Sequence, residues 1–201
     1  MLDGIMRRVI DPPLNAVGRR LVRRGVRANV VTLTGFGLGL VAAGLIGLGW
    51  TSVALVVILA SRLADGLDGA VARASQKTDF GGFLDIVCDF GFYSAIPLGF
   101  VVLDQAANGA AGAFLLASFC FNCASFLGYA VLAEKREMRT EARGSKSLYF
   151  SGGLLEGTET IAFFLALCLW PHHFAAMAWV FGALCLLTAA SRMLLARQVF
   201  G

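Results

Sequence analysis

The stretch from Asp65 to Asp89 reads "DGLDGAVARASQKTDFGGFLDIVCD" and carries five aspartates. Apolar sequence flanks it on both sides, with "TSVALVVILA" (51–60) upstream and "FGFYSAIPLGFVVL" (90–103) downstream. Carboxylates are costly inside a lipid bilayer, and they mark functional sites when they occur there. The placement of so many acids between two lipid-compatible segments therefore decides how the rest of the chain is interpreted.

The composition indicates an integral membrane protein. Of the 201 residues, 58% are hydrophobic and 15% are charged, whereas a soluble domain has about 25% charged residues. A transmembrane helix needs about 20 mostly apolar residues, and such stretches lie at roughly 30–49, 51–73, 80–103, 110–133, 150–170 and 173–196. We therefore expect an all-α, polytopic membrane protein in which six transmembrane helices form a single domain over residues 1–201.

The distribution of positive charge predicts the orientation. Cytoplasmic loops are enriched in Lys and Arg. All 17 basic residues fall on one side of the six-helix arrangement, and none lies in the breaks near Trp50, at "DQAANG" (104–109) or at "WPHH" (170–173). We therefore expect a protein of the cell (inner) membrane with both termini in the cytoplasm. The net charge of +4 then reflects topology, and no nucleic acid is expected as a partner.

Residues 1–28 are predicted to form a cytoplasmic juxtamembrane segment, followed by the six-helix bundle at 29–201. We expect a helix from Pro12, with Asp11 as its N-cap. Arginines flank an apolar stripe in this helix, which consists of Leu14, Val17, Leu21 and Val22. A basic amphipathic helix of this kind binds at the surface of an anionic membrane.

The helical periodicity predicts that the aspartates converge. Asp65 and Asp68 are three positions apart (i, i+3) and Asp85 and Asp89 four positions apart (i, i+4), so each pair shares one helix face. The second predicted helix runs inward and the third runs outward. Asp68 and Asp85 lie at similar distances from the cytoplasmic ends of these helices, and at about 1.5 Å per residue they reach a similar depth. Two pairs of carboxylates can therefore meet a few turns inside the cytoplasmic surface.

Such a cluster requires cations. Four acids deep in a membrane would cost on the order of 10 kcal/mol, and Arg62 and Arg73 offer only two positive charges. Oxygen ligands suit magnesium, calcium or manganese, and sites with two such ions handle phosphoryl chemistry. Gly69 and Ala72 leave room for a bulky group on the face that carries Arg73, which could pair with a phosphate.

These residues resemble a known family. "DGLDGAVAR" (65–73) and "GGFLDIVCD" (81–89) match every fixed position of the signature of the CDP-alcohol phosphotransferases, D-x-x-D-G-x-x-A-R…G-x-x-x-D-x-x-x-D. The resemblance implies a membrane enzyme of phospholipid synthesis that transfers a substituted phosphate from a CDP-linked donor to an alcohol and releases CMP. The implied donor is CDP-diacylglycerol, and the implied reaction is the transfer of its phosphatidyl group.

The resemblance also implies roles for individual residues. Asp89 would accept the proton of the incoming hydroxyl. A centre of two Mg²⁺ or Mn²⁺ ions would be held by Asp65, Asp68, Asp85 and Asp89. The donor would be bound by the "NVVT" segment and by three further positions, which gives Asn29, Val30, Val31, Thr32, Gly69, Arg73 and Thr78.

The acceptor alcohol is left open at this stage, between glycerol phosphate, inositol phosphate and another small alcohol. Phosphatidylinositol-phosphate synthases resemble this layout but usually carry an arginine directly after the first glutamate of the corresponding segment, where this chain has Gly157. A homodimer is left open as well. Candidate acceptor contacts are Lys135, Arg139, Glu156 and Glu159.

One alternative comes from a different class of protein. Intramembrane acids also occur in cation transporters, but these typically show internal repeats and interrupted helices, neither of which is evident here. A transporter would also not need a helix face that combines the small residue Gly69 with Arg73. The Cys120-x-x-Cys123 pair is a weak indication of zinc without a second such pair, and core packing is the preferred interpretation of these cysteines.

Overall fold

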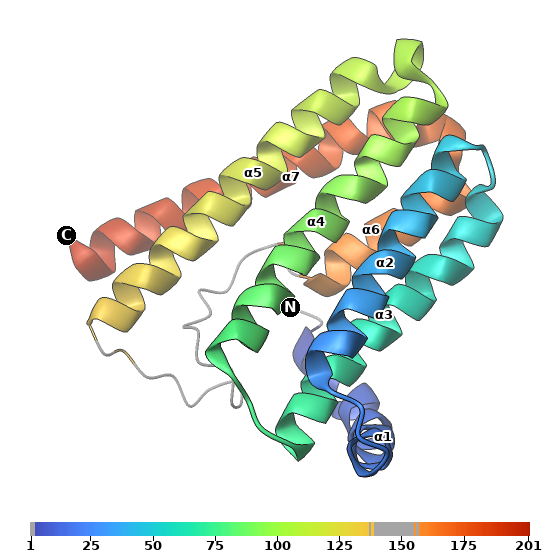
Figure 1. Cartoon of the computed structure of the whole chain (residues 1–201). Coiled ribbons are helices and arrows are strands. Elements are labelled where there is room, and N and C mark those ends of the chain that lie inside the picture. Colours follow the sequence, from blue (N-terminus) through green and yellow to red (C-terminus); the bar gives the residue numbers. More distant parts are fainter. Residues whose placement is uncertain (1–2, 137, 139–154, 156) are drawn as a thin grey trace.

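The structure, a computed structural model, describes residues 3–136, 138, 155 and 157–201. The described residues contain helices and no strand, so the predicted all-α class is confirmed (Figure 1). In chain order the elements are α1 (Asp3–Arg23), α2 (Ala28–Gly47), α3 (Thr51–Ala74), α4 (Asp79–Leu103), α5 (Gln105–Lys135), α6 (Gly157–Leu169), the 3₁₀ turn η1 (Pro171–His173) and α7 (Phe174–Phe200).

Specific residues set where the helices begin and turn. The Thr78 hydroxyl accepts a hydrogen bond from the Gly81 N–H at 3.0 Å and caps α4. Asp104 does the same for Ala107 at 3.0 Å, which starts α5 at Gln105, five residues before the predicted 110. Gly49 has a φ of +83° in the turn between α2 and α3, a conformation that glycine adopts without strain.

Helix α2 packs against both α3 and α4 and lies between them (Figure 1). Glycines allow these close approaches. A Cβ on Gly35 would lie 3.3 Å from the Ser61 carbonyl oxygen of α3, and a Cβ on Gly99 of α4 would lie 2.6 Å from the Ala43 carbonyl oxygen of α2. Helices α5 and α7 form a second packed pair. The core contains the fully buried rings of Phe92, Phe100, Phe164 and Phe174.

The approach at Gly99 gives a test of this packing. Gly99→Ala would force a methyl group against a backbone carbonyl and should cost about 1–3 kcal/mol, the usual range for overpacking. Gly44→Ala is the matched control, because nothing lies within 4 Å of its added Cβ and alanine favours the helix by about 1 kcal/mol. The midpoint temperature of thermal inactivation in detergent should fall for Gly99→Ala and should stay level or rise for Gly44→Ala. Equal midpoints would contradict the packing.

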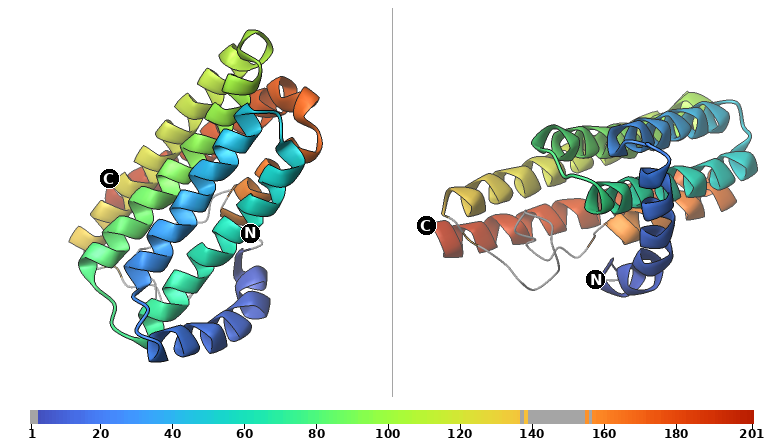
Figure 2. Two further views of the ribbon diagram at one scale, coloured as in Figure 1. Left: turned by 45° about the vertical axis from the view of Figure 1, so that its right-hand side comes forward. Right: turned by 60° about the horizontal axis from the view of Figure 1, so that its bottom comes forward.

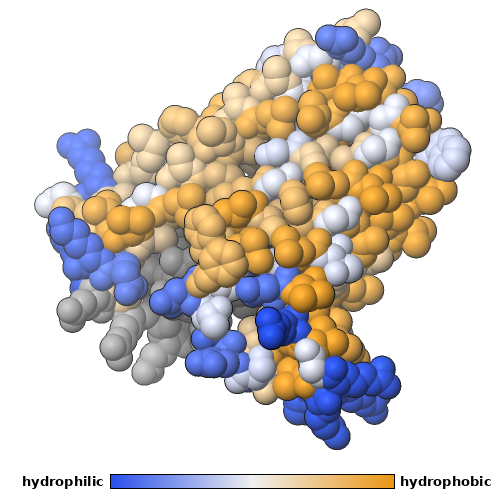
Figure 3. All heavy atoms as spheres, in the orientation of Figure 1, coloured by the Kyte–Doolittle hydropathy of each residue, from blue (hydrophilic) through white to orange (hydrophobic). Residues whose placement is uncertain are grey.

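The outer surface of the bundle is apolar. Large hydrophobic side chains such as Val56, Val102 and Leu187 are exposed, and hydrophobic residues cover the middle of the molecule, with much of the polar surface towards its ends (Figure 3). This distribution fits a bilayer around the helices. The chain is therefore an integral membrane protein of helical type.

Within the part of the chain that the structure describes, four helices are long and apolar enough to cross a membrane, by length and composition: Ala28–Gly47, Asp79–Leu103, Gln105–Lys135 and Pro171–Phe200. Helix α3 has sufficient length but carries Arg62, Asp65 and Asp68. The described part of α6 is 13 residues long, and part of the predicted span 150–170 lies outside the described residues. The predicted number of six spans therefore stays a prediction.

The N-terminal helix starts earlier than predicted. Helix α1 begins at Asp3, with Pro12 and Pro13 inside it, so the expectation that Asp11 caps a helix beginning at Pro12 is wrong. Interior prolines lack an N–H donor and bend a helix, and α1 is bent where it crosses one end of the bundle (Figure 2). Helix α1 packs closely on α3. A Cβ added to Gly18 of α1 would lie 2.9 Å from Ala70 of α3, and a Cβ added to Gly66 of α3 would lie 2.9 Å from Leu14 of α1.

Candidate active site

Three aspartates from the two halves of the signature meet in space. Asp65 and Asp68 of α3 and Asp85 of α4 each offer a carboxylate oxygen, and these three oxygens lie within 4.8 Å of one another. Helices α3 and α4 run in opposite directions along α2 (Figure 1), which brings the two acidic segments to the same level. The convergence expected from helical periodicity is thus present for these three residues.

The first turns of α2 contact both acidic segments. Thr32 is buried and lies within hydrogen-bonding reach of the Asp68 carboxylate of α3. Asn29 approaches α4, where its Oδ1 atom would be 3.2 Å from a Cβ on Gly81. In the same segment Val31 is buried, and Val30 is 55% exposed. The "NVVT" segment therefore lies against both halves of the signature, and Gly81 leaves room for this contact.

Asp89 differs from the other three acids in its surroundings. Its Oδ1 atom accepts a hydrogen bond from Nη1 of Arg62 at 2.9 Å. The same Nη1 lies 3.6 Å from Oδ1 of Asp65, and the Asp65 and Asp89 carboxyl groups lie within hydrogen-bonding reach of each other. Asp89 is therefore next to the three-carboxylate group but is held by an arginine.

The donor-binding positions predicted in and after the C-terminal part of α3 are exposed or half-buried. Arg73 is exposed, and its Nε and Nη2 atoms donate to Oδ1 of Asn15 in α1 at 3.3 and 3.0 Å. Its Nη1 would lie 3.3 Å from a Cβ on Gly69, so the guanidinium lies over that glycine. Asn15 is a neutral partner, which leaves the positive charge of Arg73 uncompensated by this contact. Thr78 caps α4, as described above.

The candidate acceptor contacts are only partly described. Lys135 is exposed in the last turn of α5, and Glu159 is half-buried in the first turn of α6. Arg139 and Glu156 lie outside the described residues. Near this segment, a Cβ on Gly157 would be 3.4 Å from the Tyr93 hydroxyl of α4, so α6 begins close to the face of α4 that carries Asp89, one turn away.

Sequence reasoning assigned no specific contact to two buried arginines. The sequence indicates Arg62 only as a source of charge, and Arg192 only as one of the 17 basic residues that predict the orientation. Arg192 is 7% exposed and donates from α7 to the Asn122 Oδ1 and Ser125 Oγ atoms of α5 at 2.9 and 2.6 Å. An arginine inside an apolar helix signals a buried partner, and this signal was available from the sequence.

The cysteines give a mixed result. Cys88, Cys168 and Cys185 are buried, whereas Cys120 is exposed and Cys123 is half-buried. Core packing is therefore the wrong interpretation for Cys120. The reason is that Cys120 lies on α5, like Cys123. The long apolar sequence of α5 does not distinguish the face that packs inside from the face that meets lipid.

The three-carboxylate group fits a divalent metal ion. Its ligand atoms are all oxygens, which is the donor set of Mg²⁺, Ca²⁺ and Mn²⁺. Asp68 is 6% exposed, and its Oδ2 atom has no hydrogen-bond partner among the described residues. A buried carboxylate oxygen without a partner is unfavourable, and a cation would compensate for it. Asp65 and Asp89 are 33% and 29% exposed, so the group opens on their side.

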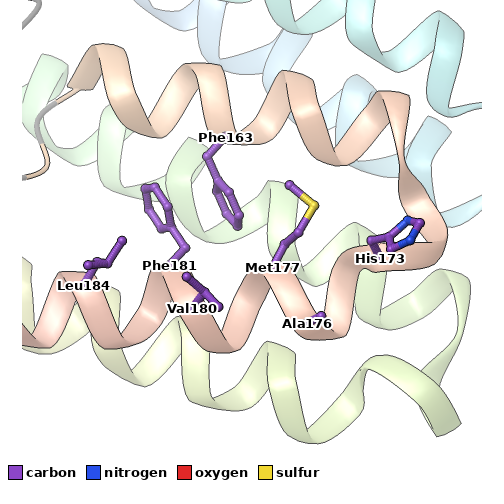
Figure 4. A pocket seen from close by; sticks show the side chains of 7 residues that line it. All are labelled: Phe163, His173, Ala176, Met177, Val180, Phe181 and Leu184. Carbon is purple, nitrogen blue, oxygen red and sulfur yellow. The ribbon is translucent and has the colours of Figure 1, made fainter.

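A separate groove lies between α6 and α7. It has a volume of about 330 Å³ and is lined by Phe163, Met177, Phe181 and Leu184, with His173 at one end (Figure 4). None of the lining residues carries a carboxylate or an arginine. The groove therefore offers contacts for hydrocarbon, and the polar chemistry lies at the carboxylates.

The chain is similar to known membrane proteins over most of its length. The sequence profile named CDP-alcohol phosphatidyltransferase matches residues 26–197. "Inner membrane protein YnjF" of Escherichia coli (strain K12) is 46% identical over 193 residues, which cover 96% of this chain and 94% of that protein. An "Archaetidylinositol phosphate synthase" of Pyrococcus horikoshii is 36% identical over 81 residues, which cover 40% of this chain and 43% of that protein.

The fold is shared with a solved enzyme. A crystal structure of Mycobacterium tuberculosis phosphatidylinositol phosphate synthase (PgsA1) with CDP-DAG bound has a TM-score of 0.71 at 23% identity, covering 90% of this chain and 91% of that one. A second structure of that enzyme, in complex with manganese and citrate, has a TM-score of 0.67 at 22% identity, covering 90% of this chain and 87% of that one. The complete signature on α3 and α4 and the match over residues 26–197 lead to one conclusion: the chain belongs to the CDP-alcohol phosphatidyltransferase family and is a transferase of substituted phosphate groups.

Proposed function

We propose that the chain transfers a phosphatidyl group from CDP-diacylglycerol to the hydroxyl of a small polar alcohol and releases CMP. The observation that carries this proposal is the convergence of Asp65, Asp68 and Asp85 within 4.8 Å. The CDP-DAG bound to the M. tuberculosis enzyme of the same fold supports the choice of donor. Mg²⁺ or Mn²⁺ is the proposed metal, and the manganese in the second structure of that enzyme supports this choice.

The roles proposed for the residues follow their positions. Asp65, Asp68 and Asp85 would hold a metal ion, and Asp89 would complete a second site; bound metal supplies charge stabilisation for the donor pyrophosphate and for CMP as it leaves. Arg73 would bind a donor phosphate through its guanidinium. Asn29 to Thr32, Gly69 and Thr78 would bind the rest of the CDP group.

Asp89 is the proposed general base. Its carboxylate is 29% exposed, so an alcohol can approach it. The acceptor hydroxyl would give its proton to Asp89 while its oxygen forms a bond to the phosphatidyl phosphorus. The bond from that phosphorus to the oxygen of CMP would break in the same step. General bases must lie within hydrogen-bonding reach of the proton they remove.

The orientation is also a proposal. Arg19, Arg20 and Arg23 lie in the second half of α1, and Arg73 lies in the last turn of α3. Arg24 and Arg27 lie between α1 and α2, and Lys77 lies between α3 and α4. Both of these connections are at the end of the bundle where α1 crosses (Figure 1). By the positive-inside rule this end faces the cytoplasm. The carboxylates would then lie near the cytoplasmic surface, with the acyl chains of the donor among the helices and its cytidine outside. Three further points stay predictions: a single domain over residues 1–201, the location of both termini in the cytoplasm, and a homodimer.

The test is CMP release from CDP-diacylglycerol by the purified protein. A panel of alcohols should include glycerol 3-phosphate, inositol phosphate and their unphosphorylated forms. The names of the relatives support the inclusion of inositol phosphate. Gly157, in the position of an arginine in such synthases, is a reason to give the other alcohols equal weight. A cation transporter would give ion flux without CMP release, so the same assay separates the two functions.

We expect the activity to depend on a divalent ion. Excess chelator should abolish CMP release, because the buried carboxylates would lose the charge that holds the donor pyrophosphate. Addition of Mg²⁺ or Mn²⁺ beyond the chelator should restore it, which an assay of labelled CMP measures directly. Full turnover in excess chelator would rule out the proposed metal centre.

A further inference from the structure

Arg62 is fixed inside the bundle by contacts on several sides. Its side chain is 9% exposed, and its guanidinium carbon lies 3.7 Å from the centre of the Phe92 ring. Its Nη2 atom donates to the Ser61 Oγ atom at 3.2 Å, and Ser61 in turn donates to the Gly35 carbonyl of α2 at 2.7 Å. The guanidinium is therefore in contact with the Phe92 ring on its face and with Ser61 at one edge.

This position is between two of the carboxylates. The Nη1 atom is 2.9 Å from Asp89 Oδ1 and 3.6 Å from Asp65 Oδ1. The group of Asp65, Asp68 and Asp85 shares only Asp65 with this contact. A second metal ion bridging Asp65 and Asp89 would therefore meet a positive charge that is already held there.

We propose that Arg62 is a positioning residue that takes the cation position beside Asp89. The enzyme without donor then binds one divalent ion tightly, at Asp65, Asp68 and Asp85. A second ion binds with the donor, whose pyrophosphate adds negative charge. The inference rests on the proposed metal centre, but Arg62 lies outside the signature and has no role in it. A purely structural arginine would affect folding without changing the number of ions bound.

The test is direct titration with Mn²⁺, in which electron paramagnetic resonance measures the free ion. Wild-type protein without donor should bind one ion tightly. Arg62→Met should bind a second ion about 10- to 100-fold more tightly than wild type does, the usual size of coupling between two sites. Arg62→Lys keeps the charge and should restore the wild-type number of ions.

Arg136→Met is the matched control. Its guanidinium donates to the Val199 and Phe200 carbonyls at 3.1 and 2.9 Å, far from the carboxylates in sequence and with no acidic partner in these bonds. Arg136→Met removes one positive charge from the protein, as Arg62→Met does. Its Mn²⁺ titration should match wild type. Equal titrations for Arg62→Met and Arg136→Met would overturn the proposal.

Two measurements keep the test decisive if Arg62→Met is less stable than wild type. The first is the wild-type titration itself, since tight binding of two ions without donor would contradict the proposal. The second is the thermal midpoint, because a ligand that binds the native state raises it. Mn²⁺ should raise the midpoint of Arg62→Met more than that of wild type, and an equal rise would count against the proposal. None of these readouts needs CMP release, so failure of the proposed reaction would be recognised separately.

Discussion

Replacement of Asp85 by Asn is expected to abolish CMP release while the protein stays folded and inserted. Asn keeps the size of the side chain but removes the negative charge from a carboxylate group whose ligand atoms lie within 4.8 Å of one another. We expect the rate to fall at least about a thousandfold, which corresponds to about 4 kcal/mol of barrier. The measurement is single-turnover CMP release at saturating metal and donor.

Asp79→Asn is the control for Asp85→Asn. Asp79 is exposed in the first turn of the same helix α4 and is not part of the three-carboxylate group, so its variant should keep most of the activity. Asp65→Asn should behave like Asp85→Asn, although the contact of Asp65 with Arg62 at 3.6 Å makes it less selective. An Asp85→Asn enzyme with more than about a tenth of the wild-type rate, a loss under about 1.4 kcal/mol, would exclude Asp85 as an essential ligand.

Asp89→Asn and Arg73→Ala are expected to separate chemistry from donor binding. Loss of a general base typically lowers turnover about 10²- to 10⁴-fold. The amide oxygen of Asn can still accept the hydrogen bond from Arg62 that Asp89 Oδ1 accepts at 2.9 Å, so the local packing should survive. Arg73→Ala should instead weaken donor binding, because its guanidinium can form two parallel hydrogen bonds to a phosphate, which lysine cannot reproduce.

The deciding measurement is equilibrium binding of CDP-diacylglycerol to both variants. Normal donor binding without turnover in Asp89→Asn, together with weak binding in Arg73→Ala, is the expected pattern. Asn15→Leu adds an intermediate case, since it keeps the charge of Arg73 and removes its hydrogen-bond partner in α1. If Arg73→Ala binds the donor as well as wild type does, its guanidinium serves only to attach α1.

Sequence periodicity predicted the parts of the fold that depend on local order. The stretches 51–73 and 80–103 agree with α3 (Thr51–Ala74) and α4 (Asp79–Leu103) within one residue at each end. The convergence of Asp65, Asp68 and Asp85 followed from helix geometry alone, because spacing along a helix fixes both the depth and the face of a side chain.

Contacts between helices could not be predicted in this way. The sequence indicates that Arg62 and Arg73 both supply positive charge near the aspartates, but it does not indicate that Arg62 pairs with Asp89 and Arg73 with Asn15. These choices depend on how α1, α2 and α4 pack around α3. The start of α1 was missed because Pro12 and Pro13 are common first-turn residues, and their presence inside a bent helix is the less frequent outcome.

The attachment of Arg73 to α1 has a practical consequence for work on the purified protein. Asn15 belongs to a helix that crosses the end of the bundle (Figure 2), and both hydrogen bonds from the guanidinium go to its Oδ1 atom. A solubilising agent that lifts α1 from α3 would release the guanidinium while leaving the carboxylates in place. The apparent KM for the donor should then depend on the detergent, whereas the maximal rate should not. Micelles and lipid nanodiscs would thus give different donor affinities for the same catalyst.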